Sequence, residues 1–298
     1  MAIRILILGR NGQVAQELAR IPWPRSVETM IAGRAECDLA EAGAAERTIK
    51  SFRPNIIINA AAYTAVDRAE KEKSAARRLN AEAIGEIAQA AAAHGAKLIH
   101  ISTDYVFDGS GSAPWRETDT CRPLSVYGST KREGEEAIRA AQQEHVILRT
   151  SWVFSRHGTN FVKTMLRLGQ TRDEVAIVGD QVGGPTAAAD VAQTAARIAA
   201  EMVHGKRAFG TYHFAGTPDT SWYGFACAIF ERAATHGLKI PSTTREITTA
   251  EYPTPARRPL NSRLDCGAIA RGWGIARPSW QTALDACVDA LAKEPVTS

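Results

Sequence analysis

The sequence predicts an α/β protein whose core is a doubly wound, parallel β-sheet. Three observations carry this prediction. Short and almost wholly apolar runs alternate with helical patterns through the first half, a glycine-rich turn directly follows the first run, and small polar residues follow several later runs. An apolar run without alternation is typical of a strand that is covered by helices on both faces, as in parallel sheets.

The first half of the chain supplies the strands and helices of this sheet. Ile3–Leu8 is apolar at nearly every position and predicts a buried strand. Further strands are expected at 30–32, 55–60, 97–102 and 146–149, with helices at 13–21, 42–52, 75–95 and 126–142. Right-handed crossovers between parallel strands place such helices on both faces of the sheet.

The second half has a different character, because its strands are short and interspersed with Gly and Pro. Strands are expected at 175–178, 211–215 and 245–248, and helices at 187–203, 222–236 and 280–293. No linker separates the halves. We therefore expect a nucleotide-binding part over residues 1–150, to which a segment of about 175–215 returns. A smaller, interleaved α/β part over 151–298 is expected to bind the substrate.

Composition narrows the classes of partner. The chain has 298 residues, of which 45% are hydrophobic and 23% charged, as in ordinary globular proteins. Its net charge of +4 is spread along the chain, whereas nucleic-acid binders cluster their cations on one face. We expect a small anionic ligand and neither nucleic acid nor membrane, since the apolar start stops at Gly9, too early for a span.

The cysteines indicate a reducing compartment. There are five of them, widely spaced and without a CxxC pair. An odd number at such spacing argues against a disulfide framework and against a structural zinc site. We therefore expect free thiols and a cytoplasmic protein.

A dinucleotide site is predicted where the first strand meets the first helix. The turn runs Gly9-Arg10-Asn11-Gly12-Gln13-Val14-Ala15. Glycines let the backbone approach a pyrophosphate, and the helix start offers free N–H groups to it. The spacing is GxxGxxA and not GxGxxG, so a plain tight turn is the alternative. The position after strand one favours the cofactor, with Gly9 and Gly12 in contact with it.

Later residues suggest which nicotinamide cofactor is used. An NAD site usually places an acidic side chain at the end of the second strand, but here Gly33 and Arg34 follow it. Arg34 is expected to pair with the 2′-phosphate of NADPH, unless it is simply a solvated surface charge. Asp38 and Leu39 come slightly later and are expected beside the adenine. After the third strand, small residues lead into Ala62, Tyr63 and Thr64.

The catalytic prediction depends on the order of three motifs along the chain. Thr103 follows the strand at 97–102, and Tyr127 and Lys131 are four residues apart on a helix, so they share one face. A nearby ammonium lowers the pKa of a phenol, which suits Tyr127 to protonate a carbonyl oxygen. Thr103 is expected to polarise that oxygen. YxxxK alone often occurs by chance on an ordinary helix face, so the order of motifs carries the prediction.

These motifs together resemble the dTDP-4-dehydrorhamnose reductases, a family of extended short-chain dehydrogenases with a Rossmann-type fold. The resemblance runs from about residue 3 to residue 290. It rests on these segments: GRNGQVAQEL, NAAAYTAVDRAE, STDYVFDG, VYGSTK, RTSWVF, NFVKTMLRL, DQVGGPT and YPTPARRPLNSRLD. It implies reduction of the 4-keto group of dTDP-4-dehydro-L-rhamnose to dTDP-L-rhamnose, a bacterial cell-envelope precursor, with NADPH or NADH.

The resemblance also implies roles for individual residues. Tyr127 is implied as the proton donor, Lys131 as the ribose-binding partner and Thr103 as the hydroxyl that orients the carbonyl. Asp104 and Trp152 are implied as contacts of the sugar nucleotide. The resemblance also places Gly12, Gln13 and Val14 at the cofactor's pyrophosphate, and Ala62, Tyr63 and Thr64 beside the cofactor. Family members can dimerise around magnesium held by carboxylates. Here Glu17 offers one carboxylate, but Ala189 stands where a second acid is expected, so no metal ligands are assigned and a homodimer remains an expectation.

Further substrate contacts are expected in the second half. Arg257 and Arg258 lie in a proline-punctuated stretch at 252–264, and Arg grips phosphate in a bidentate way. Trp152 offers a flat apolar face for a 6-deoxy sugar. The alternatives are that these arginines are surface charges and that Trp152 and Trp222 are core residues.

Two other functions stay open at this point. A sugar-nucleotide epimerase or dehydratase uses the same Tyr and Lys, but a dehydratase needs an Asp-Glu pair after the Thr. Here Asp104 is followed by Tyr105, which favours simple reduction. A non-catalytic regulatory subunit of the same fold would not need Thr103, Tyr127 and Lys131 together.

Overall fold

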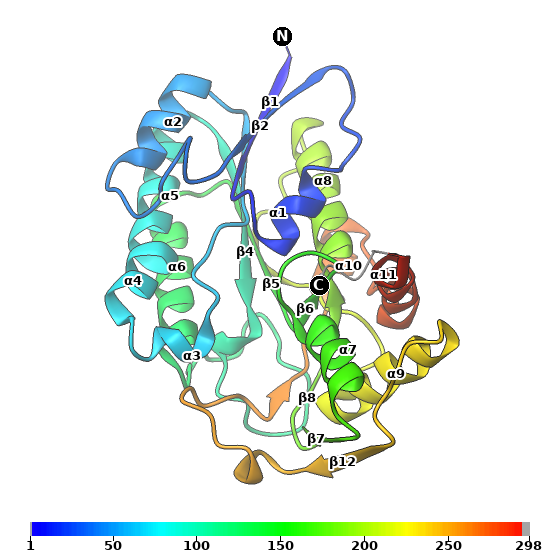
Figure 1. Ribbon diagram of the computed structural model, residues 1–298. Coiled ribbons are helices and arrows are strands. Elements are labelled where there is room, and N and C mark those ends of the chain that lie inside the picture. Colours follow the sequence, from blue (N-terminus) through cyan, green and yellow to red (C-terminus); the bar gives the residue numbers. More distant parts are fainter. Residues whose placement is uncertain (1, 294–298) are drawn as a thin grey trace.

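A six-stranded parallel sheet forms the centre of the molecule, which confirms the predicted α/β class (Figure 1). The computed structural model describes residues 2–293. The strand order across the sheet is β10-β5-β4-β3-β1-β2. The strands are β1 (Ile3–Leu8), β2 (Val27–Ala32), β3 (Ile56–Asn59), β4 (Lys97–Thr103), β5 (His145–Thr150) and β10 (Gly210–His213).

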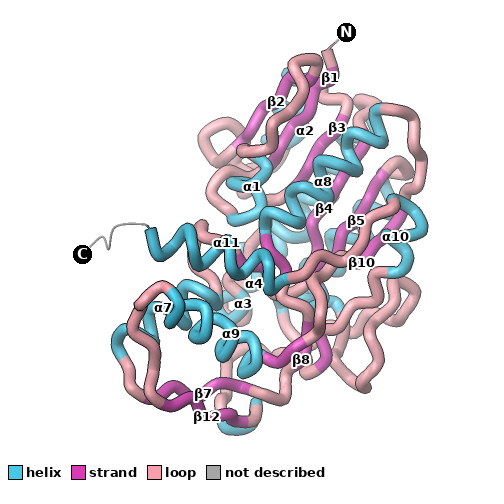
Figure 2. Tube along the Cα trace, turned by 90° about the vertical axis from the view of Figure 1, so that its right-hand side faces the viewer, coloured by secondary structure: helices cyan, strands magenta, loops and turns pink. Residues whose placement is uncertain are grey.

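Helices cover both faces of this sheet, as the apolar runs predict (Figures 1 and 2). One face carries α1 (Gln13–Leu18) and α8 (Ala188–Val203), and the other carries α2 (Ala44–Phe52), α5 (Ala83–Ala93) and α6 (Val126–Ala141). Strand β1 serves both cores: Ile5 and Ile7 pack on the α8 side, Leu6 and Leu8 on the α2 side. Burying each such side chain contributes about 1.5–3 kcal/mol, so both sets of contacts fix the strand.

The helix expected at 75–95 contains a π-helical turn. It consists of α4 (Lys73–Arg77), the π turn η1 (Arg78–Glu82) and α5. The inserted turn lies against α6, where a Cβ on Gly134 would come 2.1 Å from the carbonyl oxygen of Asn80. Hydrophobic periodicity does not reveal such a turn, because one extra residue shifts the pattern only locally.

The second half forms a smaller layer of helices and short strands below the large sheet in Figure 1. Its helices α7, α9 and α11 share a separate apolar core. These elements are β6 (Val153–Phe154), α7 (Phe161–Thr171), β7 (Glu174–Val178), β8 (Val182–Gly183), β9 (Thr186–Ala187), β11 (Thr220–Ser221), α9 (Trp222–Thr235), β12 (Thr243–Ile247), β13 (Asn261–Ser262) and α11 (Trp280–Lys293). Helix α10 (Gly267–Trp273) instead packs against β10 of the large sheet.

The two parts of the chain interleave, because α8 packs on the large sheet and β10 pairs with β5 at its edge. The expectation that all of 175–215 returns to that sheet is wrong for β7. This strand pairs in parallel with β12, because the two bury Val175, Ile177 and Ile247. The division at residue 150 stays a prediction, and its last residues, 294–298, lie outside the described part of the chain. Helix α7 was not expected from the sequence.

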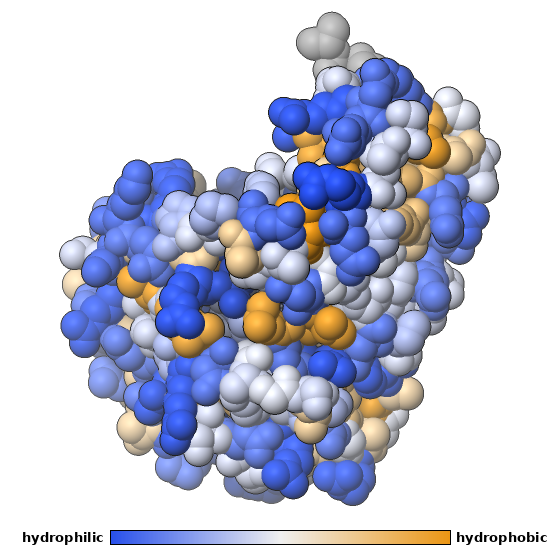
Figure 3. Space-filling view, turned by 90° about the horizontal axis from the view of Figure 1, so that it is seen from below, coloured by the Kyte–Doolittle hydropathy of each residue, from blue (hydrophilic) through white to orange (hydrophobic). Residues whose placement is uncertain are grey.

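The surface carries few large exposed apolar side chains. Among residues 2–293 these are Ile240, Tyr252 and Leu260, all beyond α9 in the chain. Figure 3 views the molecule from below and shows small separate apolar patches among hydrophilic residues. Within the same residues, the search for a helix long and apolar enough to cross a membrane found none.

Candidate active site

The glycine-rich turn lies at the carboxyl edge of the sheet, against the loop that follows β3. Gly9 has a φ of +107°, which favours glycine, and a Cβ there would come 3.2 Å from the backbone N of Ala61. The side chains of Gln13 and Val14 form contacts within the protein. Gln13 Oε1 accepts hydrogen bonds from Asn160 (2.9 Å) and from a serine before α7, and Val14 is buried in the core. Only their backbone is therefore available to a ligand.

A cavity of about 450 Å³ is lined by residues from three segments, among them the loops after β2 and β3. Five of the predicted cofactor residues line it, namely Arg34, Asp38, Ala62, Tyr63 and Thr64. Leu39 is instead buried in the core on the α2 side. The structure thus brings the loops after β2 and β3 together, as the sequence predicts.

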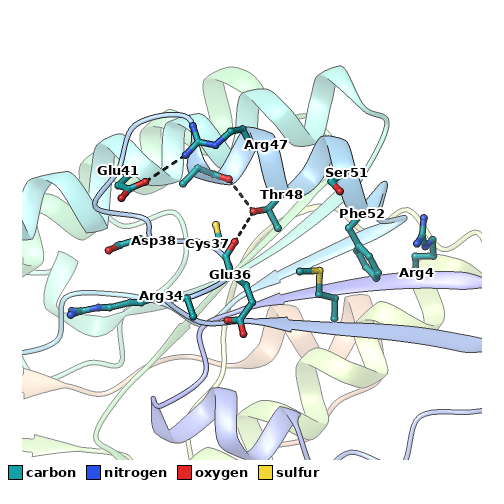
Figure 4. Close-up of a pocket in the computed structure, with 13 residues that line it drawn as sticks. Arg4, Arg34, Glu36, Cys37, Asp38, Glu41, Arg47, Thr48, Ser51 and Phe52 are labelled. Atoms are coloured by element: carbon teal, nitrogen blue, oxygen red, sulfur yellow. Dashed lines mark hydrogen bonds and ion pairs between the residues drawn. The ribbon is translucent and has the colours of Figure 1, made fainter.

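A second cavity of about 600 Å³ is lined mainly by the loop after β2 and by helix α2 (Figure 4). It shares Arg34 and Asp38 with the first cavity and also has Arg47 and Glu41 in its wall. The mixture of cations and carboxylates gives it no clear preference for an anion.

An acidic side chain that the sequence analysis missed occupies the end of β2. Glu36 Oε2 accepts the backbone N–H of Gly33 at 2.8 Å, and Glu36 Oε1 pairs with Arg10 Nη2 at 2.7 Å. These contacts hold the pKa of Glu36 below its usual value. The carboxylate comes three residues after Gly33 and folds back, so a search for an acid directly after the strand overlooks it.

Asn80 joins the loop after β3 to helix α6. Its Oδ1 accepts the backbone N–H of Tyr63 (2.8 Å), and its Nδ2 donates to the Tyr63 carbonyl (3.1 Å) and to Thr130 Oγ1 (3.2 Å). Thr130 in turn donates to the carbonyl of Tyr127 at 3.0 Å. The π turn therefore places a buried amide where it fixes the Tyr63 loop relative to Tyr127.

Thr103 and Tyr127 lie together at the end of β4. Helix α6 can approach this strand end closely because residue 128 is a glycine. A Cβ on Gly128 would come 2.1 Å from the carbonyl oxygen of Tyr105. The rings of Tyr105 and Tyr127 meet edge to face at 5.6 Å. Burial raises the pKa of Tyr127 to about 12, although a hydrogen bond with Thr103 opposes the shift. The phenol is therefore protonated at neutral pH.

Lys131 is fully buried below Tyr127. Its Nζ lies 2.7 Å from the carbonyl oxygen of Ile101 and 3.0 Å from His100 Nε2. Burial lowers the pKa of Lys131 to about 8, and the nearby Glu135 carboxylate partly opposes this shift. The prediction that Lys131 lowers the pKa of Tyr127 is wrong for the free protein. The Lys131 amine is hydrogen-bonded to the Ile101 carbonyl of β4, and burial is the largest influence on the pKa of Tyr127, which it raises.

Asp104 is a buried acid beside Thr103. Its Oδ1 accepts a hydrogen bond from Thr103 Oγ1 at 3.1 Å. Burial raises its pKa to about 6, and the hydroxyls of Ser262 and Thr103 limit the increase. A buried carboxyl with a raised pKa at the edge of a sheet is a typical feature of functional sites.

Trp152 adopts an unusual backbone conformation next to this edge. Its φ of +51° is uncommon for a bulky residue, and such strain often marks functional positions. Its ring is buried and stacks on Trp222 with centroids 3.7 Å apart. The structure therefore gives Trp152 a packing role as well as a position near the site.

The two predicted phosphate-binding arginines differ in their surroundings. Arg258 forms a bidentate ion pair with Asp67, with Nη2–Oδ2 at 2.8 Å and Nη1–Oδ1 at 3.0 Å. Arg257 is exposed to solvent. The charge of Arg258 is thus compensated within the chain, which the sequence could not indicate across 191 residues of separation.

A metal site receives no support from the described residues. Within residues 2–293, the search for groups of three or more His, Cys, Asp or Glu side chains able to hold a metal ion found none. Glu17 lies 3.4 Å from His157, and Ala189 adds no carboxylate.

Known proteins resemble this chain over nearly its full length. Residues 3–293 match the family described as the RmlD substrate binding domain. A dTDP-4-dehydrorhamnose reductase of Aggregatibacter actinomycetemcomitans is 45% identical over 284 residues, covering 94% of this chain and 97% of the relative. One of Sinorhizobium fredii is 43% identical over 297 residues, covering 98% and 99%. A solved dTDP-4-dehydrorhamnose reductase of Bacillus anthracis, in complex with NADP, has a TM-score of 0.89 and 33% identity, covering 97% of this chain and 100% of that one.

Proposed function

This chain belongs to the family of the RmlD substrate binding domain, and we propose that it is a dTDP-4-dehydrorhamnose reductase. It reduces the 4-keto group of dTDP-4-dehydro-L-rhamnose with NADPH or NADH and yields dTDP-L-rhamnose, in dTDP-rhamnose biosynthesis. The observation that carries the proposal is the convergence of Thr103, Tyr127 and Lys131 at the carboxyl edge of the sheet. In open α/β sheets this edge is where ligands bind.

The residues around the first cavity fit a nicotinamide dinucleotide. The close approach of Gly9 to the loop after β3 leaves bare backbone at the pyrophosphate position, and a Cβ at Gly9 would crowd it. Gly12 follows at the start of α1. Arg34, Asp38 and the Ala62–Thr64 segment would hold the adenosine half in the cavity. When bound, the reduced nicotinamide supplies the hydride.

The chain's own side chains then manage the proton and the charge. Tyr127, whose high pKa keeps it protonated, donates its phenolic proton to the carbonyl oxygen of the substrate. Thr103 donates a hydrogen bond to the same oxygen and polarises it. Lys131, in its ammonium form, stabilises the negative charge that Tyr127 acquires on losing its proton.

Substrate recognition is proposed for residues around this edge. Asp104 accepts a hydrogen bond from Thr103, and Trp152 follows β5, the strand paired with β4. Arg257 is exposed to solvent, so its guanidinium is free to bind a diphosphate. Arg258 contributes indirectly, because its pairing with Asp67 fixes the segment that carries both arginines.

We do not extend the proposal to magnesium, because Ala189 stands where the resemblance implies a second acid and hard cations need several oxygen ligands. A homodimer remains a prediction, which sedimentation equilibrium would check. We also place the protein in the cytoplasm, which the odd number and wide spacing of its cysteines support.

The test is NADPH oxidation with a panel of dTDP- and GDP-linked 4-keto sugars. The proposal expects turnover with dTDP-4-dehydro-L-rhamnose and formation of dTDP-L-rhamnose. Turnover with none of the panel would refute the proposal. It would favour the alternatives, namely an epimerase or dehydratase of the same fold or a regulatory subunit.

A further inference from the structure

Three buried polar side chains lie in a row beneath Tyr127. Asn59 ends β3, His100 lies within β4, and Lys131 lies on α6. Asn59 Nδ2 is 2.9 Å from His100 Nδ1, and His100 Nε2 is 3.0 Å from Lys131 Nζ. Each residue is at most 1% exposed, so water does not replace these contacts. The direction of every hydrogen bond in the row is therefore fixed by protein groups.

The backbone of Ala61 sets the orientation of the Asn59 amide. Its N–H donates to Asn59 Oδ1 at 3.1 Å. A backbone N–H only donates, so a flipped amide would place two donors against each other. The amide nitrogen of Asn59 must then face His100 and donate to its Nδ1.

This orientation selects one tautomer of His100. Burial holds the pKa of His100 well below its usual value, so the ring is neutral. A neutral imidazole carries one N–H. Since Nδ1 accepts from Asn59, the hydrogen is on Nε2 and points at Lys131.

An ammonium group has three donors and no acceptor, so it cannot receive this hydrogen bond. A neutral amine has a lone pair that can. We propose that His100 is a positioning residue which donates from Nε2–H to Lys131 and thereby favours the neutral amine in the free protein. Asn59 controls this effect through the tautomer. Protonating Lys131 requires each hydrogen bond in the row to change direction. The Asn59 amide would then have to flip, and its hydrogen bond with the Ala61 N–H would be lost.

Other charged groups near Lys131 do not remove this conflict. Glu135 lies on the same helix, but its oxygens accept from Arg149 Nη2 and Ser102 Oγ, both at 2.6 Å. Burial of Tyr127 and Asp104 raises the pKa of both groups, so the phenol is neutral and the carboxyl titrates near pH 6. The fall in the pKa of Lys131 to about 8 agrees with a site that disfavours the ammonium.

The consequence for catalysis rests on the proposed function. If Lys131 supports Tyr127 as an ammonium, then the row from Asn59 to Lys131 sets the upper pH limit of the reaction. Activity should fall as the pH rises through about 8, where Lys131 loses its proton. The hydrogen-bond row itself exists without cofactor or substrate, so it can be tested separately.

The first experiment is nitrogen NMR of the free protein labelled with ¹⁵N-histidine. Protonated and unprotonated ring nitrogens have well-separated shifts, and the His100→Gln variant identifies the His100 signals among the seven histidines. Above about pH 8, where Lys131 is mainly the neutral amine, we expect a neutral ring with its hydrogen on Nε2. A hydrogen on Nδ1, or a charged ring, in that pH range overturns the inference whether or not the protein is a reductase.

The second experiment reverses the row with Asn59→Asp. A carboxylate accepts from Ala61 N–H and also from His100 Nδ1–H, which leaves Nε2 to accept from the Lys131 ammonium. We expect the NMR signals to switch to the Nδ1–H tautomer, and the pKa of ¹⁵N-labelled Lys131 to rise by at least about one unit. The basic limb of the kcat profile should move up by the same amount. If the His100 tautomer is unchanged in a folded variant, Asn59 does not control it. If the protein is a reductase but the tautomer and the Lys131 pKa do not change, the inference is wrong while the proposed function stands.

Discussion

Arg10 and Glu36 form an ion pair at the end of β2, with 2.7 Å between Nη2 and Oε1. The glycine-rich turn supplies the cation, and the loop after β2 supplies the anion. The remaining carboxylate oxygen accepts the Gly33 N–H. This is where NAD-binding proteins place an acid for the ribose hydroxyls, while a free arginine there would suit a 2′-phosphate. The pair therefore bears on the choice between NADH and NADPH.

Glu36→Gln should shift this choice toward NADPH. The substitution removes a negative charge that opposes a 2′-phosphate and releases Arg10 from its ion pair. Because both groups are partly exposed and screened, the expected gain in the ratio of NADPH to NADH affinity is about two- to tenfold. Fluorescence titration with both cofactors measures it.

Two arginine variants serve as controls for this prediction. Arg10→Ala and Arg34→Ala separate the two candidate phosphate ligands, since each removes one guanidinium near the same cavity. The variant that weakens NADPH much more than NADH identifies the residue in contact. If Glu36→Gln changes both affinities equally, Glu36 has no part in selectivity.

Tyr127→Phe should retain cofactor binding and lose most of its turnover. The ring still packs against Tyr105, but the proton donor is gone. Loss of one acid–base group usually costs about 10²–10⁴-fold in rate. The measurement is kcat together with the Kd of NADPH, and near-normal kcat would exclude Tyr127 as the acid.

Asp104→Asn should change how stability depends on pH. Burial raises the pKa of Asp104 from 3.8 to about 6, so the folded protein holds a proton that the unfolded chain has lost. The stabilisation from this group is complete below about pH 4 and is lost as the pH rises through about 6. The variant does not titrate, so above that pH it should be more stable than the parent by about 3 kcal/mol. Urea unfolding at several pH values tests this, and parallel curves for the two proteins would contradict it.

Trp152→Ala should raise KM for the sugar nucleotide while the Kd of NADPH barely changes. Loss of the stack on Trp222 also lowers stability, since deleting a buried Trp side chain costs about 3–5 kcal/mol. A matched control is Trp23→Ala, which lies before β2 begins and thus at the opposite edge of the sheet. The control should lose stability without a change in KM. Equal kinetic effects of the two variants would leave Trp152 as a packing residue only.

The sequence reveals those features that depend on local pattern. The run Ile3–Leu8 predicts a strand covered on both faces, and the four-residue spacing of Tyr127 and Lys131 predicts a shared helix face. The end of the strand at 97–102 places Thr103. Each of these inferences needs only the period of a strand or helix.

Other features depend on contacts between distant segments. His100 looks like one more core position of a strand until the structure places Asn59 and Lys131 on either side of it. Asn80 acts from a π turn that periodicity does not show. The charge of Arg258 is compensated by Asp67, a residue from the first half of the chain. Sequence spacing alone could not supply these pairings.

The stoichiometry of cofactor oxidation tests the central claim most directly. Purified protein is given dTDP-4-dehydro-L-rhamnose and excess NADPH, and the NADPH oxidised is compared with the ketone consumed. A reductase oxidises one NADPH for each molecule of dTDP-L-rhamnose formed. Epimerases and dehydratases recycle a bound cofactor, so conversion of the sugar without net oxidation of NADPH would contradict the account.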